Sequence, residues 1–282
     1  MKKILVTTDF SVNSRKAIHF AMQLATQTPC ELIFYNVVEI FRPTIWDHVY
    51  YGQYEANELK RSQKTLEQFI HTIYQKSTIK KTSYKCICQV GMNASNKIIE
   101  YAKEIKADYI CISTLGSGKL IQLFGTTASQ LVAFCPIPVF IIPKNYKSKT
   151  ITNVCFASDL INLEEELDRV QQFTVQVKAK LNILHFDYLV RLKAKKNKFN
   201  KLMRRYETEN TSFHFNELNA LYPLNKHIQK YIQKTRTSVL ISFTKQNRNW
   251  FDKLFLSSKT ADMAFDTKTP MLVFKKNKII SK

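Results

Sequence analysis

The 282-residue chain is 45% hydrophobic, which is enough length and apolar content for two domains of about 140 residues each. Its 43 Lys and Arg outnumber its 22 Asp and Glu, and the formal net charge of +21 favours contact with polyanions such as nucleic acid or with an anionic membrane face. No apolar run reaches the roughly 18 residues of a membrane-spanning helix, and the run after Met1 is too short for a signal peptide, so a cytoplasmic protein is expected.

The six cysteines include no CxxC pair, and no histidine stands beside them at zinc-ligand spacing. Cys86 and Cys88 share one face of an expected strand. This spacing suits metal binding or oxidation, but two small buried hydrophobic side chains are the simpler interpretation. The cysteines are therefore compatible with a reducing compartment.

Residues 1–146 alternate strands with helices. The opening strand, 2–10, contains Asp9 near its end, and the segment 14–27 after it repeats apolar residues at helical spacing. A loop rich in aromatic residues is expected at 39–52. The other expected elements of this half are strands 31–38, 83–90, 109–112 and 137–143, and helices 54–76, 94–105 and one that ends near Phe134.

The same order repeats after a polar, basic linker at 144–150. The stretch ITNVCFASDL, 151–160, mirrors the opening KKILVTTDF and again has an aspartate near its end, Asp159. The repeat predicts an internal duplication, with domains at 1–146 and 150–282. Strands that alternate with helices predict parallel five-stranded sheets with right-handed crossovers and helices on both faces. The other expected elements of the second half are strands 181–188, 211–218, 238–243 and 270–274, and helices 162–178, 193–208, 223–236 and 258–267.

The loop after the strand at 109–112 holds three of the five glycines, Gly116, Gly118 and Gly125, and a helix begins directly afterwards at Thr126. A strand, a glycine loop and a helix N-terminus form a place for phosphate, because glycine lets backbone N–H groups approach an anion and the helix dipole adds positive partial charge. The residues match neither a P-loop nor a GxGxxG dinucleotide fingerprint. An ordinary loop with hydroxyl caps is therefore the alternative interpretation.

Three stretches make the chain similar to the universal stress protein family, in a tandem form that covers nearly the whole sequence. They are ILVTTDFS at the start, FYNVVE in the second strand and DYICISTLG…LFGTTASQLVAFCPIPVFIIP at the end of the first half. The resemblance implies two tandem Rossmann-like domains of the adenine nucleotide alpha hydrolase type. The family's nucleotide pattern is G-x2-G-x9-G-S/T. Gly116 matches its second glycine and Gly125-Thr126 its final pair, whereas Ser113 replaces the first glycine and the second spacing is eight residues.

The resemblance also implies a ligand and its contacts. In nucleotide-binding members the aspartate after the first strand lies near the adenosine, the end of the second strand contacts the base, and the loop holds the phosphates. An adenine nucleotide, ATP or AMP, with Mg²⁺, is thus expected outside the carboxyl ends of the strands, where ligands of open parallel sheets bind. Its expected contacts are Asp9, Val37, Ser113, Gly116, Gly125, Thr126 and Thr127. An N-terminal cap on the first helix is the alternative role of Asp9.

The second half is expected not to bind phosphate. No glycine follows Gly125, Ser257-Ser258 take the place of the Gly-Thr pair, and Trp250 and Phe251 stand nearby, so side chains should block a close backbone approach. This domain is expected to have a structural or pairing role. In the family the last strand often pairs across a dimer interface. The two last strands of this chain are therefore expected to form an intramolecular pseudo-dimer, with a homodimer as a further option.

The segment 191–205 holds eight basic residues and no acidic residue. A solvated helix face explains it most simply, and a contact surface for polyanions is the functional interpretation. The residues that would make this contact are Arg191, Lys193, Lys195, Lys196, Lys198 and Lys201.

Two functions of different classes follow from the sequence. The first is a cytoplasmic, nucleotide-binding stress-response or regulatory protein with at most slow ATP hydrolysis, because no catalytic set of Ser-His-Asp, Cys-His or paired carboxylates emerges. The second is a nucleotide-free interaction protein that binds nucleic acid or an acidic partner through its basic surface. Ser113 and the short loop favour the second function, and the Gly125-Thr126 pair opposes it.

Overall fold

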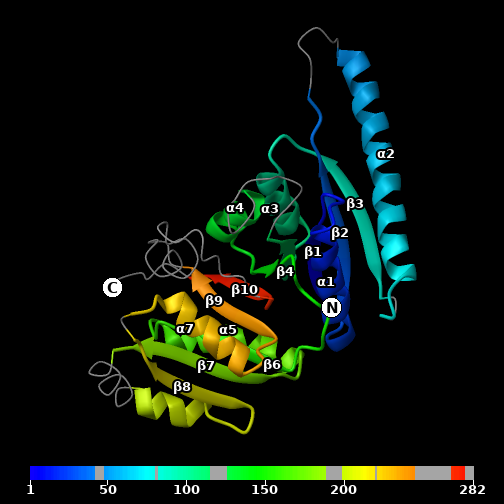
Figure 1. Cartoon of the computed structure of the whole chain (residues 1–282). Coiled ribbons are helices and arrows are strands. Elements are labelled where there is room, and N and C mark those ends of the chain that lie inside the picture. Colours follow the sequence, from blue (N-terminus) through cyan, green and yellow to red (C-terminus); the bar gives the residue numbers. More distant parts are fainter. Residues whose placement is uncertain are drawn as a thin grey trace. The chain divides into compact units, whose positions relative to one another are not determined.

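The chain folds as two compact units, Met1–Lys144 and Asn145–Lys282, called unit 1 and unit 2 below. The computed structural model describes residues 1–41, 48–79, 82–114, 126–188, 199–219, 221–244 and 268–276. Figure 1 shows strands and packed helices in each unit. Both units have the mixed α/β architecture that the alternating sequence pattern predicted.

Unit 1 is built on five parallel strands in the order β3-β2-β1-β4-β5. The strand order reverses at β1, which has β2 on one side and β4 on the other, and such a switch point is where open α/β sheets bind ligands. The elements are β1 (Lys2–Thr7), α1 (Ser14–Gln27), β2 (Cys30–Val38), α2 (His48–Gln75), β3 (Tyr84–Val90), α3 (Ala94–Glu104), β4 (Tyr109–Ser113), α4 (Thr126–Phe134) and β5 (Val139–Ile142).

Helices cover both faces of the unit 1 sheet. Figure 1 shows α2 on one side of the strands and the pair α3 and α4 on the other. The chain just before α1 packs on α2, where the rings of Phe10 and Phe69 lie 5.5 Å apart. Helix α1 buries Ala17, Ile18 and Leu24, the apolar residues whose spacing predicted it. The buried stripe holds α1 on the sheet because it removes apolar area from water.

Helix α2 also protects the outer strand β3. The Gln63 amide nitrogen donates to the carbonyl of Cys86 at 2.8 Å, and the Gln63 amide oxygen accepts from the N–H of Cys88 at 3.0 Å. One side chain therefore satisfies an acceptor and a donor of a strand edge, which would otherwise be open to pairing with another chain.

Unit 2 repeats the plan of unit 1 with five parallel strands in the order β10-β9-β6-β7-β8. Here β6, β7, β8, β9 and β10 take the places of β1 to β5. The elements are β6 (Asn153–Ala157), α5 (Leu163–Gln176), β7 (Lys180–Asp187), a helix over 199–206, β8 (Thr211–Glu217), α7 (Leu224–Lys234), β9 (Val239–Thr244) and β10 (Met271–Lys275).

Unusual backbone conformations recur at equivalent points of the two units. Phe10 after β1 and Leu160 after β6 have φ of 62° and 63°, and Lys106 after α3 and Arg236 after α7 have φ of 53° and 51°. A non-glycine residue in this left-handed region costs roughly 1–2 kcal/mol. Such turns would not recur at matching places by chance, so they support the internal duplication that the sequence predicted.

The sequence-based elements are confirmed with two clear differences. Strand β1 ends at Thr7 rather than near residue 10, because the chain turns at Phe10. The loop expected at 39–52 is wrong over its last part, since α2 begins at His48. Gly52 suggested a loop, but a Cβ there would meet nothing within 4 Å, and a helix tolerates one exposed glycine at about 1 kcal/mol. The helix expected at 258–267 lies outside the described residues.

Candidate functional site

Three residues of the expected nucleotide site lie along the carboxyl edge of the unit 1 sheet. Asp9 comes two residues after β1, Val37 is next to the last residue of β2, and Ser113 ends β4. Continued past the end of β1, the register puts Asp9 level with Val37 of the adjacent strand β2, and it puts Ser113 of β4 level with Thr8, the residue before Asp9. Gly116 and Gly125 fall outside the described residues, so their part of the site stays a prediction.

A fixed turn presents Asp9 at this edge. The Asp9 side chain is exposed, and its Oδ1 accepts from the N–H of Ser11 at 3.1 Å. The Thr8 hydroxyl accepts from the N–H of Phe10 at 3.1 Å, and the Thr8 carbonyl accepts from the Asn36 amide at 2.8 Å. These bonds tie the turn to β2 and hold the carboxylate beside the point where the strand order reverses.

A serine satisfies one backbone donor at the start of helix α1. The N–H of Ser14, the first residue of α1, donates to the Ser11 hydroxyl at 3.1 Å, whereas the N-cap residue Asn13 makes no side-chain cap hydrogen bond. A cap on α1, the alternative role of Asp9, stays a prediction.

The N-terminus of α4 contributes the second polar feature of the site. Thr126 and Thr127 are its first two residues, and its first turn contains no acidic residue, so no carboxylate of that turn offsets the positive partial charge of the helix N-terminus. The Ser95 hydroxyl, at the start of α3, contacts the amide oxygens of Gln130 and, at 2.7 Å, Asn93. This contact fixes α4 against α3.

Apolar side chains complete the edge. Val12 after β1, Phe41 after β2 and Met92 after β3 are 72%, 79% and 85% exposed. Val37 packs closely over Gly91, because a Cβ on Gly91 would lie 3.2 Å from Val37 Cγ1. Apolar surface around a few polar groups is the composition of most small-molecule sites.

Unit 2 repeats the turn after its first strand. The N–H of Leu160 donates to the Ser158 hydroxyl at 3.0 Å, and the N–H of Ile161 donates to Asp159 Oδ1 at 2.9 Å. The Ser158 carbonyl contacts His185 Nδ1 at 2.8 Å, in the place of the Asn36 contact in unit 1. Asp159 is thus the structural counterpart of Asp9, as its position in the sequence suggested.

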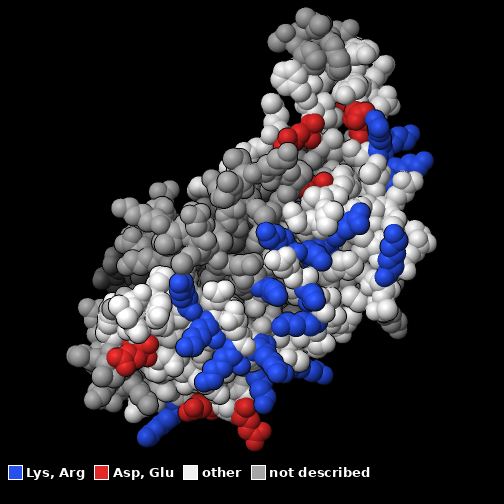
Figure 2. Space-filling model, in the orientation of Figure 1, with Lys and Arg blue, Asp and Glu red and all other residues white. Residues whose placement is uncertain are grey.

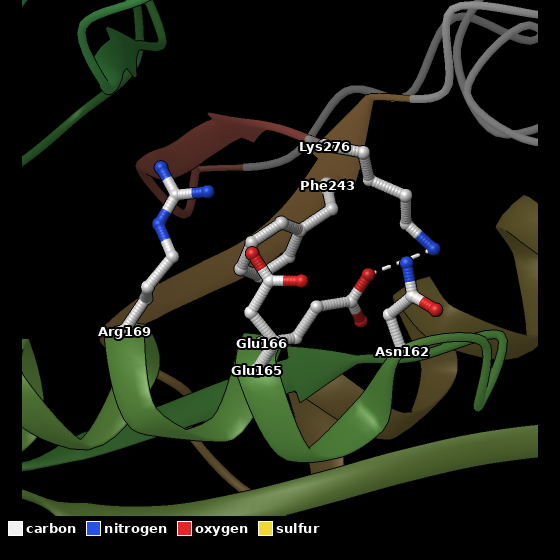
Figure 3. Close-up of a pocket in the computed structure, with 6 residues that line it drawn as sticks. All are labelled: Asn162, Glu165, Glu166, Arg169, Phe243 and Lys276. Carbon is white, nitrogen blue, oxygen red and sulfur yellow. Dashed lines mark ion pairs between the residues drawn. The ribbon is translucent and has the colours of Figure 1, made fainter. Parts of the chain in front are cut away.

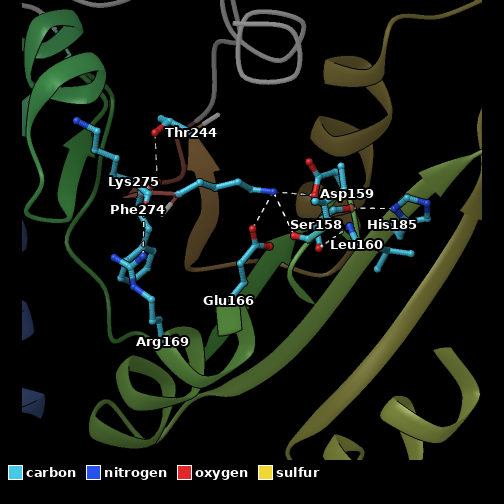
Figure 4. A network of polar contacts seen from close by, with 11 residues as sticks. Ser158, Asp159, Leu160, Glu166, Arg169, His185, Thr244, Phe274 and Lys275 are labelled. Atoms are coloured by element: carbon cyan, nitrogen blue, oxygen red, sulfur yellow. Dashed lines mark hydrogen bonds and ion pairs between the residues drawn. The ribbon is translucent and has the colours of Figure 1, made fainter. Parts of the chain in front are cut away.

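The surroundings of that aspartate differ because Lys276 reaches it. The Lys276 ammonium lies 2.8 Å from Asp159 Oδ1 and 2.8 Å from Glu166 Oε1, and it donates to the carbonyl of Ile161 at 3.3 Å. Figure 4 shows Asp159 and Glu166 turned toward the same ammonium. The side chains of Lys276, Asp159 and Glu166 are only 9%, 12% and 4% exposed. Burial raises the pKa of Glu166 to about 7, and the nearby Lys276 partly opposes this rise.

A small pocket remains beside this cluster (Figure 3). Arg169 forms one wall, 5.3 Å from the Phe243 ring centre and 4.8 Å from that of Phe274, and it donates to the Lys275 carbonyl at 2.9 Å. The lining residues are Asn162, Glu165, Glu166, Arg169, Phe243 and Lys276. The free space of about 10 Å³ fits about one water molecule, so this pocket cannot accept a nucleotide.

Sequence reasoning missed Glu166 and Lys276. The apolar stripe of α5 contained a signal, because Leu163, Leu167 and Val170 are buried and Glu166 falls on the same helical face. A carboxylate on that face is expected to need a buried partner. Nothing in the local sequence identified the partner, which follows more than one hundred residues later.

A comparison with protein-family models decides the family. The model described as "Universal stress protein family" matches residues 1–143. The chain belongs to the universal stress protein family. A search of curated proteins finds no match.

Two solved structures resemble the whole chain, unit 2 included. A universal stress protein from Archaeoglobus fulgidus has a TM-score of 0.66 and 14% identity over 98% of each chain. A protein of unknown function from Pseudomonas aeruginosa has a TM-score of 0.56 and 16% identity, covering 98% of this chain and 92% of its own. At these identities the likeness shows that the fold is shared over both units.

The described residues contain neither a membrane-spanning helix nor a cluster of metal ligands. None of the helices there is long and apolar enough to cross a membrane. In the same part of the chain, no group of three or more His, Cys, Asp or Glu side chains is placed to hold a metal ion.

Proposed function

We propose that this universal stress protein is a regulatory protein that binds one adenine nucleotide, ATP or AMP, at the carboxyl edge of unit 1 and none in unit 2. One contrast supports the proposal most directly. Asp9 is exposed at the edge of unit 1, whereas its counterpart Asp159 is nearly buried and ion-paired with Lys276. A hydroxyl-rich ligand such as ribose can reach the exposed carboxylate of Asp9, whereas the carboxylate of Asp159 is only 12% exposed and is covered by a lysine.

The residue expected to contact the adenine base also differs between the two units. Asn36 and His185 contact equivalent carbonyls, so the next residues, Val37 and Phe186, are equivalent as well. Phe186 packs against His227 with 5.4 Å between ring centres. In unit 2 a larger side chain therefore takes the place where the family resemblance puts the base contact of unit 1.

The phosphates would lie at the start of α4. The N–H groups of Thr126 and Thr127 and their hydroxyls are suited to hold them, because a helix N-terminus attracts anions. In the proposed site Gly116 and Gly125 allow the backbone to approach the phosphates. Mg²⁺ would bind mainly through phosphate oxygens and waters, as it does in most nucleotide sites.

Titration calorimetry of the full chain with ATP and AMP tests the proposal. One site per chain is expected. The variant Val37→Phe copies the unit 2 residue into unit 1 and should weaken binding at least about tenfold, or roughly 1.4 kcal/mol. The matched variant Phe186→Val should leave affinity and stoichiometry unchanged.

Two other results would contradict the proposal. Two equivalent sites would show that unit 2 also binds a nucleotide, and unchanged binding by Val37→Phe would show that the carboxyl edge of unit 1 is not the site. Absence of any nucleotide binding would favour the second function, an interaction protein in which Ser113 and the shortened loop have removed the nucleotide site.

A further inference from the structure

Helix α7 exposes a row of cations, called the α7 basic row below. Lys226, Lys230 and Lys234 follow at intervals of four residues, so they share one side of the helix about 6 Å apart, and Arg236 lies two residues further, just beyond the helix. Lys230, Lys234 and Arg236 are exposed and Lys226 is half-buried. Figure 2, in the orientation of Figure 1, shows basic side chains gathered over the region of α7.

The charges of this row are not neutralised within the part of the chain that the structure describes. No described carboxylate forms an ion pair with any of the four cations. Elsewhere Lys2 pairs with Asp108, and Lys85 pairs with Glu31. Lys149 adds a fifth positive charge at the end of α7, where its Nζ lies 3.5 Å from the Thr237 carbonyl. The row is thus a surface of uncompensated positive charge.

Helix stability does not explain the row. Lysines near the end of a helix interact favourably with its dipole, which accounts for Lys234 and Arg236. Lys226 lies in the first turn, where a cation is unfavourable by about 0.3–1 kcal/mol, and like charges four residues apart destabilise a helix further. Ile228 and Ile232 are buried and hold α7 on the sheet without the lysines. Another role for the charges is therefore indicated.

Unit 1 provides an internal comparison. The equivalent helix, α3, also has 11 residues, and its buried Ile98 and Ala102 match Ile228 and Ile232. With this alignment, Glu100 and Glu104 of α3 occupy the positions of Lys230 and Lys234, and Asp108 occupies that of Ser238. The duplicated fold thus accommodates acidic residues at the positions of Lys230 and Lys234, so these two lysines are particular to unit 2, whereas Arg236 has a basic counterpart in Lys106.

An aromatic ring lies at the start of the row. Tyr222 is 52% exposed, and the Lys226 ammonium lies 5.8 Å from its ring centre. Aromatic rings beside a row of cations are how proteins bind single-stranded nucleic acid, with bases stacked on the rings and phosphates on the cations. A membrane-surface helix would instead present its apolar face, which α7 buries through Ile228 and Ile232.

We propose that the α7 basic row and Tyr222 form a binding surface for single-stranded nucleic acid. The cations contact successive phosphates, and Tyr222 stacks on a base at one end. The surface belongs to unit 2 and is separate from the nucleotide site proposed for unit 1. It is also distinct from the basic segment 191–205. Of the polyanion contacts expected there, Lys201 is exposed on the helix over 199–206, and the others lie outside the described residues: Arg191, Lys193, Lys195, Lys196 and Lys198.

Fluorescence anisotropy of the full chain with a labelled oligo-uridine, measured over a range of salt concentrations, tests the surface. The double variant Lys230→Glu with Lys234→Glu copies the residues of unit 1 and is expected to fold. It should weaken binding at least tenfold and make the slope of log affinity against log salt shallower by about 1.4, or about 0.7 for each lost phosphate contact. Tyr222→Ala should weaken binding without changing that slope.

A matched control separates the row from net charge. Lys60 and Lys64 are exposed on α2, also four residues apart, and changing both to Glu alters the charge of the chain equally. This control should bind nearly as the unchanged protein does. Equal losses in both double variants would overturn the proposal.

Two further results would also overturn it. In the first, the unchanged chain fails to bind the oligo-uridine but binds anionic phosphatidylserine vesicles, and the Lys230→Glu and Lys234→Glu double variant binds these vesicles less well. This result would assign the row to a membrane. In the second, affinity is lost in a variant with Lys195, Lys196 and Lys198 changed to Gln but retained in the α7 double variant; this would move the nucleic-acid surface to the segment 191–205.

Discussion

The ammonium of Lys276 lies 2.8 Å from Oδ1 of Asp159, although the two residues are 117 positions apart in the chain. The contact joins the residue after β10 to the turn after β6. It closes the edge of unit 2 that corresponds to the proposed nucleotide site of unit 1. The same contact makes unit 2 depend on a buried lysine.

Replacing Lys276 with Met should destabilise unit 2 by about 3–5 kcal/mol, because Asp159 and Glu166 would lose the cation that compensates their burial. Hydrogen exchange in peptides from β6 and β7 should accelerate, whereas peptides from β1 and β2 should not change. Arg205→Met is the control, since its ion pair with Glu164 is exposed and should contribute no more than about 1 kcal/mol. Similar small losses in both variants would show that the buried cluster is not important for stability.

The stability of unit 2 should depend on pH through Glu166. Its pKa is raised from 4.5 in the unfolded chain to about 7 in the folded protein. The folded state therefore holds the proton more tightly, and the stabilisation is complete below pH 4.5 and is lost as pH rises through 7. Because the Glu166 side chain is only 4% exposed, we expect unit 2 to lose roughly 1–3 kcal/mol of unfolding free energy over this pH range.

Urea unfolding between pH 4.5 and 8, monitored through hydrogen exchange in peptides of unit 2, measures this dependence. The difference in unfolding free energy between the unchanged chain and Glu166→Gln should shrink as pH rises and become constant above about pH 8. A difference that is constant over the whole range would contradict the assignment.

Gln63→Ala should destabilise unit 1 by about 1–3 kcal/mol, because it leaves the Cys86 carbonyl and the Cys88 N–H of the outer strand without their side-chain partner. Chemical unfolding and the tendency to aggregate measure the effect. Gln68→Ala is the matched control, as Gln68 is exposed on the same helix. No difference between the two alanine variants would mean that water replaces Gln63 at no cost.

The cysteines should react slowly in the folded protein. Burial raises the pKa of Cys30 and Cys88 to about 11 and that of Cys86 to about 12. At pH 8 these thiols are almost entirely protonated, and only the thiolate is the nucleophile. A thiol-specific disulfide reagent should therefore modify the native chain slowly and all six cysteines in urea. Fast modification of any cysteine in the native chain would disprove this expectation.

Much of the fold could be predicted from the sequence because its signals are local. The apolar spacing of Ala17, Ile18 and Leu24 predicted α1, and the alternation of strands and helices predicted two parallel sheets. An aspartate recurs after the first strand of each half, as Asp9 and Asp159, which indicated equivalent turns. The structure places the two residues in turns of the same kind, one in each unit. Periodicity and turn chemistry act over a few residues, so a single sequence contains them in full.

Only the tertiary structure decided how the two aspartates differ. Each aspartate lies two residues after the first strand of its unit, in a turn of the same kind. Asp159 is nevertheless paired and nearly buried, because the strand order β10-β9-β6 leaves only β9 between the end of β10 and the turn after β6. Whether Lys276 reaches that carboxylate depends on strand register and on the burial of Glu166 in the stripe of α5. These relations join residues far apart in the chain. Side-chain electrostatics act through space, and no pattern along the sequence specifies which distant charges the fold will bring together.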